Sequence, residues 1–105
     1  MSEILFPTFP ILMVDDETHL LYSFELTLGD AGMNNTVCCS DSREVMHIIT
    51  DQEIGILLLD LSLPFISGQE LLEKIKAEFP EIPIIIKIIL ATFTYSYSIL
   101  KYFCE

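Results

Sequence analysis

The feature that most constrains the fold is a set of short, continuous apolar segments separated by helical patterns. Three such segments are ILMV (Ile11–Val14), IGILLL (Ile54–Leu59) and III (Ile84–Ile86). Continuous apolar runs of this length are typical of strands that are buried on both faces of a sheet. A shorter β-prone segment spans Thr36–Cys39. Together these segments predict the strands of one buried, parallel sheet.

The intervals between these strands have the spacing of amphipathic helices. The first helix is expected from about Glu17 to Ala31, and the second begins after Ser40 or Asp41, both of which are good N-cap residues. The third follows Ser67 and Glu70, which have the spacing of a capping box. The order β-α-β-α-β-α-β predicts an α/β fold with helices on both faces of the sheet. At 105 residues, the chain is expected to form one domain, 1–105.

The charge of the chain limits its partners. Sixteen acidic residues stand against five basic ones, which gives a net charge of -11. Such a chain repels phosphate backbones and has no basic face for anionic lipid, so we expect neither nucleic-acid binding nor membrane binding.

The cysteines and the N-terminal residues indicate the compartment. Cys38, Cys39 and Cys104 form no CxxC motif and no Cys/His ligand pair, so we expect reduced thiols in a cytoplasmic protein. The N-terminal MSEILFPTFP contains an acid, two prolines and no basic segment, so it does not resemble a signal peptide.

Carboxylates follow two of the predicted strands. Asp15 and Asp16 come directly after the first strand, and Asp60 follows IGILLL. Ligands of parallel α/β sheets bind at the carboxyl ends of the strands, so neighbouring strands would bring these three side chains together. Like charges this close need compensation, and Mg²⁺ prefers oxygen ligands of this kind. For Asp16 alone, an N-cap of the following helix is an equally good explanation.

These segments also carry the motifs of a known family. The segments ILMVDDE and LLLDLSLPFISGQELL, with D-x-x-x-P-x-x-x-G at Asp60, Pro64 and Gly68, resemble the receiver domain of two-component response regulators. The resemblance covers about Ile11 to Ile86. It implies a flavodoxin-like fold with five strands in the order 2-1-3-4-5.

The resemblance also implies a function in two-component phosphorelay signal transduction. Asp60 would accept a phosphoryl group from a sensor histidine kinase, which would make the chain a phosphoprotein. Asp15, Asp16, Asp60 and the backbone carbonyl of Ser62 would hold Mg²⁺, which neutralises charge on the phosphoryl group. Receivers are switches, so the expected catalysis is limited to self-directed phosphorylation and dephosphorylation, and we do not expect an enzyme.

The chain departs from the family over 87–105. Family members carry Ser or Thr and then a small residue at the end of the fourth strand, where this chain has Ile88 and Ile89. They also carry a Lys-Pro after a fifth strand, and this chain has none; neither Lys87 nor Lys101 lies in a matching context. Those two groups convert phosphorylation into a conformational change. Their loss favours an alternative function, a degenerate, non-phosphorylated receiver that serves as an interaction or dimerisation module.

The C-terminal segment has its own pattern. Apolar and hydroxyl side chains alternate from Thr92 to Ile99, which is typical of a half-buried strand. After Ile88 too few residues remain for a parallel crossover, so we expect no ordinary fifth strand. The segment would fold back over the sheet, or pair with another copy of the chain to form a homodimer, which we favour. Lys87 and the hydroxyl residues disfavour a membrane span. A truncated gene or a displaced reading frame would also produce such a change in composition.

A third class of function does not fit the acidic pair. Phosphatases that use an aspartyl nucleophile and Mg²⁺ carry D-x-D after the first strand, and the Asp15–Asp16 pair does not supply that spacing. The sequence therefore favours a receiver.

Overall fold

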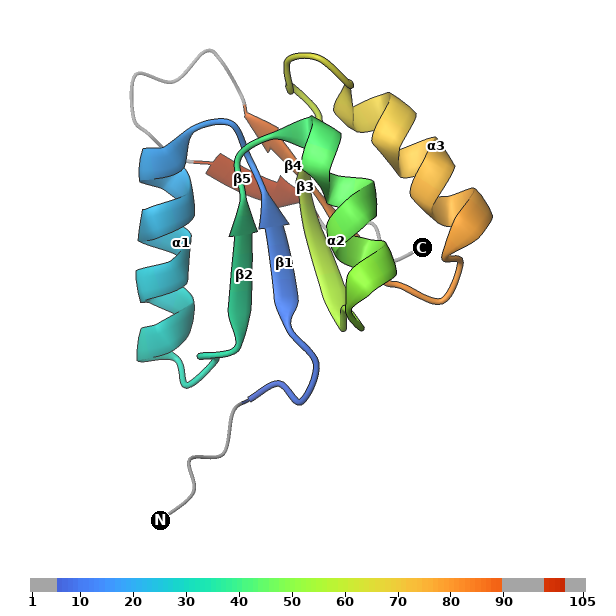
Figure 1. The fold of residues 1–105 in the computed structure, drawn as a ribbon. Coiled ribbons are helices and arrows are strands. Elements are labelled where there is room, and N and C mark those ends of the chain that lie inside the picture. The colour runs from blue at the N-terminus through green and yellow to red at the C-terminus, as the bar shows by residue number, and fades with distance from the viewer. Residues whose placement is uncertain (1–5, 90–97, 102–105) are drawn as a thin grey trace.

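The computed structural model describes residues 6–89 and 98–101, and these form a sheet with helices on both sides (Figure 1). Its elements are β1 (Ile11–Val14), α1 (Thr18–Asp30), β2 (Thr36–Cys39), the short 3₁₀ helix η1 (Ser42–Glu44), α2 (Val45–Asp51), β3 (Ile56–Asp60), α3 (Gly68–Glu78), β4 (Ile84–Ile89) and β5 (Ser98–Lys101). The strand order is β2-β1-β3-β4-β5, and the first four strands are parallel. The flavodoxin-like arrangement predicted from the sequence is confirmed.

The sheet separates two apolar clusters. The larger one lies between the sheet and helices α2 and α3, and its completely buried members are Leu12, Val45, Leu57, Leu59, Leu71 and Ile75. The smaller one lies on the α1 face and contains Ile11, Met13 and Leu21. Alternate residues of β1 point to opposite faces, so Leu12 and Val14 join the larger cluster, whereas Ile11 and Met13 join the smaller one. Figure 1 shows α1 on one side of the sheet and α2 with α3 on the other.

Helix α3 begins as its sequence predicts. The hydroxyl of Ser67 accepts a hydrogen bond from the backbone N–H of Glu70 at 3.1 Å, which satisfies one of the free donors of the first turn. Leu71 and Ile75, one turn apart, are completely buried against the sheet. This placement fixes the helix directly beside the loop that follows β3.

The C-terminal part of the sheet differs from the prediction. β4 continues past Ile86 to Ile89, and β5 pairs with it in the antiparallel direction, with Ile88 opposite Ile99. The expected absence of an ordinary parallel strand is confirmed for Ser98 and Ile99, whereas Thr92–Tyr97 lies outside the described residues. The expected outcomes were a helix or irregular cover over the sheet face, or pairing with a second copy, so this strand pairing within the chain was not predicted. An antiparallel return needs no crossover helix, so the short connection between Ile89 and Ser98 is sufficient.

Among the helices of the described ranges, none has both the length and the apolar character that crossing a membrane requires.

Candidate functional site

Two adjacent strands bring the predicted carboxylates together. β1 and β3 are parallel neighbours, with Val14 beside Leu59 in register, so Asp15 and Asp60 follow at the same edge of the sheet. Asp16 joins them, and the three side chains each offer a carboxylate oxygen within 4.8 Å of the others. The clustering expected from the strand ends is therefore present. The N-cap position of α1 belongs to Glu17, so Asp16 does not serve as the cap of that helix.

The three carboxylates differ in exposure and in their hydrogen bonds. Asp15 and Asp60 are only 2% and 3% exposed, whereas Asp16 lies at the surface. The backbone N–H of Glu17 donates to Asp15 Oδ1 at 2.9 Å, and the N–H of Ser62 donates to Asp60 Oδ1 at 3.0 Å. These bonds hold both buried carboxylates in fixed orientations, while Asp16 faces water at the mouth of the site.

Burial sets the protonation behaviour of Asp60. Loss of water around the side chain raises the pKa of the Asp60 carboxyl above its usual value. The nearby charge of Asp15 raises this pKa further, while the Ser62 N–H and the Lys87 ammonium oppose the rise. A cation that enters the site would therefore favour the ionised form of Asp60.

Lys87 is a fourth member of the site, and the sequence analysis did not place it there. The residue is 4% exposed, its ammonium donates to Asp15 Oδ2, and its position on β4 is in register with Asp60 on β3. The ammonium also lies 5.4 Å from the centre of the Phe24 ring on α1. A cavity of about 10 Å³ remains among Asp15, Asp60, Lys87 and their apolar neighbours, about the size of one water molecule.

The alternation of side chains along β4 could have predicted that Lys87 belongs to the site. Ile84 and Ile86 belong to the cluster under α2 and α3, so Ile85 and Lys87 must point to the α1 face. That is the face on which Asp60 and Asp15 lie, because Leu59 and Val14 also point into the larger cluster.

The loop after Asp60 depends on a close approach at Gly68. A Cβ at this glycine would lie 2.4 Å from Leu61 Cα and 2.5 Å from the carbonyl oxygen of Asp60. The backbone N–H of Gly68 donates to the carbonyl of Leu61 at 3.2 Å. The start of α3 therefore packs directly on the end of β3, which explains why the motif places a residue without a side chain at this distance from Asp60.

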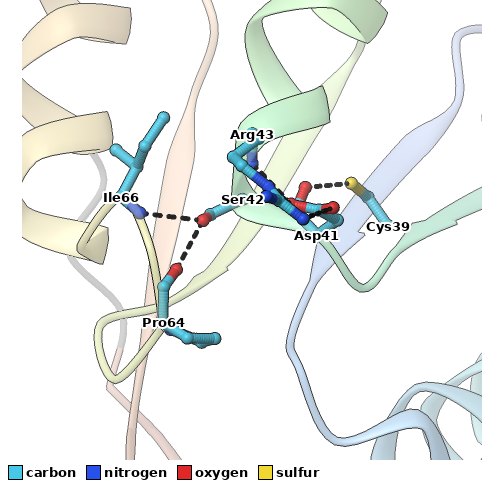
Figure 2. Close-up of polar contacts among 6 residues, drawn as sticks. All are labelled: Cys39, Asp41, Ser42, Arg43, Pro64 and Ile66. Carbon is cyan, nitrogen blue, oxygen red and sulfur yellow. Dashed lines mark hydrogen bonds and ion pairs between the residues drawn. The ribbon is translucent and has the colours of Figure 1, made fainter.

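Ser42 fixes the far side of the same loop (Figure 2). Its buried hydroxyl, 1% exposed, donates to the carbonyl of Pro64 at 2.6 Å and accepts from the N–H of Ile66 at 3.1 Å. The next residue, Arg43, lies over the ring of Phe65, 3.8 Å from the ring centre. Phe65 has a φ of 69°, a backbone conformation that is uncommon for aromatic residues. These contacts join the loop after β3 to the segment that begins α2.

Fold and site together define a flavodoxin-like α/β domain with an acidic site at the carboxyl ends of β1 and β3. The family model of the response regulator receiver domain matches residues 11–93. The chain belongs to this family, the receiver domains of two-component systems.

Individual relatives agree with this assignment. The transcriptional regulator NtrC of Klebsiella pneumoniae is 34% identical over 74 residues, which cover 70% of this chain and 16% of NtrC. The probable transcriptional regulatory protein TcrX of Mycobacterium tuberculosis is 30% identical over 76 residues, which cover 72% of this chain and 32% of TcrX. This chain thus spans a small part of the length of these curated relatives.

Solved structures support the fold. A CheY-like receiver domain protein of Methanospirillum hungatei superimposes with a TM-score of 0.69 at 31% identity, covering 73% of this chain and 61% of that one. A receiver domain protein of Clostridium thermocellum gives a TM-score of 0.68 at 30% identity, covering 73% and 62% of the two chains.

Proposed function

We propose that this chain is a phosphoacceptor receiver and that Asp60 takes the phosphoryl group from a sensor histidine kinase. The observation that carries the proposal is the position of Asp60, at the carboxyl end of β3 and within 4.8 Å of carboxylate oxygens of Asp15 and Asp16. Family membership supports the same assignment.

The reaction transfers one phosphoryl group to the Asp60 carboxylate. A carboxylate oxygen of Asp60 forms a P–O bond while the P–N bond to the kinase histidine breaks, and the electron pair of that bond stays on the imidazole nitrogen. The bond between the Ser62 N–H and Asp60 Oδ1 orients the carboxylate, so that Oδ2 is the oxygen left for attack. The chain's own part in the reaction is limited to the Asp60 carboxylate, which accepts the group, and the kinase phosphohistidine is the donor.

The donor set fits a magnesium ion. Asp15, Asp16, Asp60 and the backbone carbonyl of Ser62 would hold Mg²⁺, because all of them offer the hard oxygen ligands that this ion prefers. When bound, Mg²⁺ would neutralise charge on the phosphoryl oxygens. Asp60 and Asp15 contribute from buried positions and Asp16 from the surface, where hydrated ions arrive.

The test is phosphorylation by a small-molecule donor. The full chain is incubated with phosphoramidate and Mg²⁺, and the intact mass is measured. We expect one phosphoryl group on the wild type, none on Asp60→Asn, and wild-type labelling of Asp30→Asn, which changes an exposed carboxylate at the end of α1.

Two results would refute the assignment. Equal labelling of Asp60→Asn would show that another residue is the acceptor. A folded wild type that takes no phosphoryl group would favour the degenerate receiver, a module that acts through protein contacts alone.

A further inference from the structure

Lys87 is an unusual residue for the interior of a sheet. Lysine is almost never fully buried unless its charge is paired, because removing an ammonium from water is costly. Here the side chain is 5% exposed and the ammonium is bound to Asp15 Oδ2. The other oxygen of that carboxylate accepts the N–H of Glu17. Both oxygens of Asp15 therefore already have a partner in the protein.

The charges of the site explain why a cation is needed. Asp15 and Asp60 are buried side by side, and a carboxylate of Asp16 lies within 4.8 Å of both. Within the described ranges Lys87 is the cation that pairs with this cluster, and its register with Asp60 places it beside the second buried carboxylate. The cavity at this point measures about 10 Å³, so little space remains for another cation on this side.

We propose that Lys87 is a built-in counter-ion of the acidic site and competes with Mg²⁺ for the Asp15 carboxylate. The ammonium compensates the cluster when no metal is bound, so the fold does not depend on Mg²⁺. Metal binding then requires the ammonium to release Asp15 Oδ2, which weakens the apparent affinity. The inference deepens the proposed function in that it concerns the metal site of the same receiver, but its test needs no phosphorylation.

The test compares metal binding by the wild type, Lys87→Met and a control. Methionine keeps an unbranched side chain of similar length and removes the charge, while Lys74→Met removes a lysine charge on the exposed face of α3. Isothermal titration with MgCl₂ and melting curves over a range of MgCl₂ concentrations are measured on the full chain. We expect Lys87→Met to bind Mg²⁺ about tenfold or more tightly than the wild type and Lys74→Met to bind as the wild type does. Equal affinities of the wild type and Lys87→Met would overturn the proposal.

A charge-balanced variant separates compensation from packing. Lys87→Met alone leaves the carboxylates uncompensated, so it is expected to melt at a lower temperature in EDTA and to recover when Mg²⁺ is added. The double variant Asp15→Asn/Lys87→Met removes one charge of each sign, and we expect it to stay folded in EDTA and to respond little to Mg²⁺.

If Lys87→Met is unfolded in EDTA, circular dichroism during a MgCl₂ titration measures its recovery. Failure to refold with Mg²⁺, or a double variant as unstable as the single one, would show that the side chain acts through packing and would overturn the proposal. A wild type that is not phosphorylated while these metal effects hold would refute the proposed function and leave this inference standing.

Discussion

The close approach of α3 to β3 predicts that Gly68→Ala destabilises the fold. The added Cβ would lie 2.4 Å from Leu61 Cα and 2.5 Å from the Asp60 carbonyl oxygen, and both are backbone atoms that cannot rotate away. Carbon atoms are in favourable contact at about 3.5–4.0 Å, so the start of the helix must move by roughly 1 Å. Overpacking of this kind costs about 1–3 kcal/mol, and the better helix propensity of alanine returns up to about 1 kcal/mol. We expect a net loss of about 1–2 kcal/mol in the free energy of unfolding.

The control for this experiment is a glycine in the other long helix. Gly29 lies in α1, and a Cβ there would have no atom within 4 Å, so Gly29→Ala is expected to leave stability unchanged or to raise it by up to about 1 kcal/mol. Both variants are measured by urea denaturation followed by circular dichroism and linear extrapolation. A Gly68→Ala variant as stable as the wild type would show that α3 does not pack on the end of β3 in this way.

Three further variants test other parts of the structure. Ser42→Ala removes the hydroxyl that pairs with Pro64 and Ile66, so it is expected to lower the free energy of unfolding, measured by urea denaturation, by about 2 kcal/mol. The control Ser40→Ala changes an exposed residue and is expected to lower it by under about 0.5 kcal/mol. Equal losses for the two variants would contradict the contacts of Figure 2. In EDTA, Asp60→Asn is expected to be more stable than the wild type at pH 7, because burial raises the pKa of the Asp60 carboxyl and folding opposes its ionisation. The folded chain holds the proton of the Asp60 carboxyl more tightly than the unfolded chain does. The stability advantage of Asp60→Asn over the wild type should therefore shrink as the pH falls and vanish below the ordinary aspartate pKa of 3.8. A stability advantage that does not depend on pH would refute this account. Ile75→Ala changes a completely buried position of α3 and is expected to lower the free energy of unfolding, measured by urea denaturation, by about 2–5 kcal/mol. A loss under about 1 kcal/mol would contradict the place of Ile75 in the core.

Local patterns in the sequence were sufficient to predict the central sheet and the carboxylate cluster. Continuous apolar runs identify strands buried on both faces, and a parallel sheet places the ends of those strands at one edge. Asp15 and Asp60 therefore meet as a consequence of topology, and no side-chain detail was needed to place them. The cap at Ser67 was found for a similar reason, since its hydrogen bond lies within one turn of the chain.

Features that depend on the exact register, strand face or loop path of distant segments were not predicted. The pairing of Lys87 with Asp15 joins residues on β4 and β1, and it depends on the register and face of both strands. The role of Ser42 depends on the path of a loop beyond β3, and its sequence neighbour Asp41 is the better helix cap. The alternation from Thr92 to Ile99 indicates a strand, but it specifies neither the partner nor the direction of pairing. The antiparallel contact of β5 with β4 thus had no local signal.

The separation of the two apolar clusters by the sheet has a consequence for how such a domain evolves. Most of the buried apolar side chains lie under α2 and α3, whereas Asp15, Asp60 and Lys87 lie on the opposite face at one edge. A substitution in the charged group therefore does not require the larger cluster to repack. The charge or the ligand of the acidic site can therefore change while the same scaffold continues to fold.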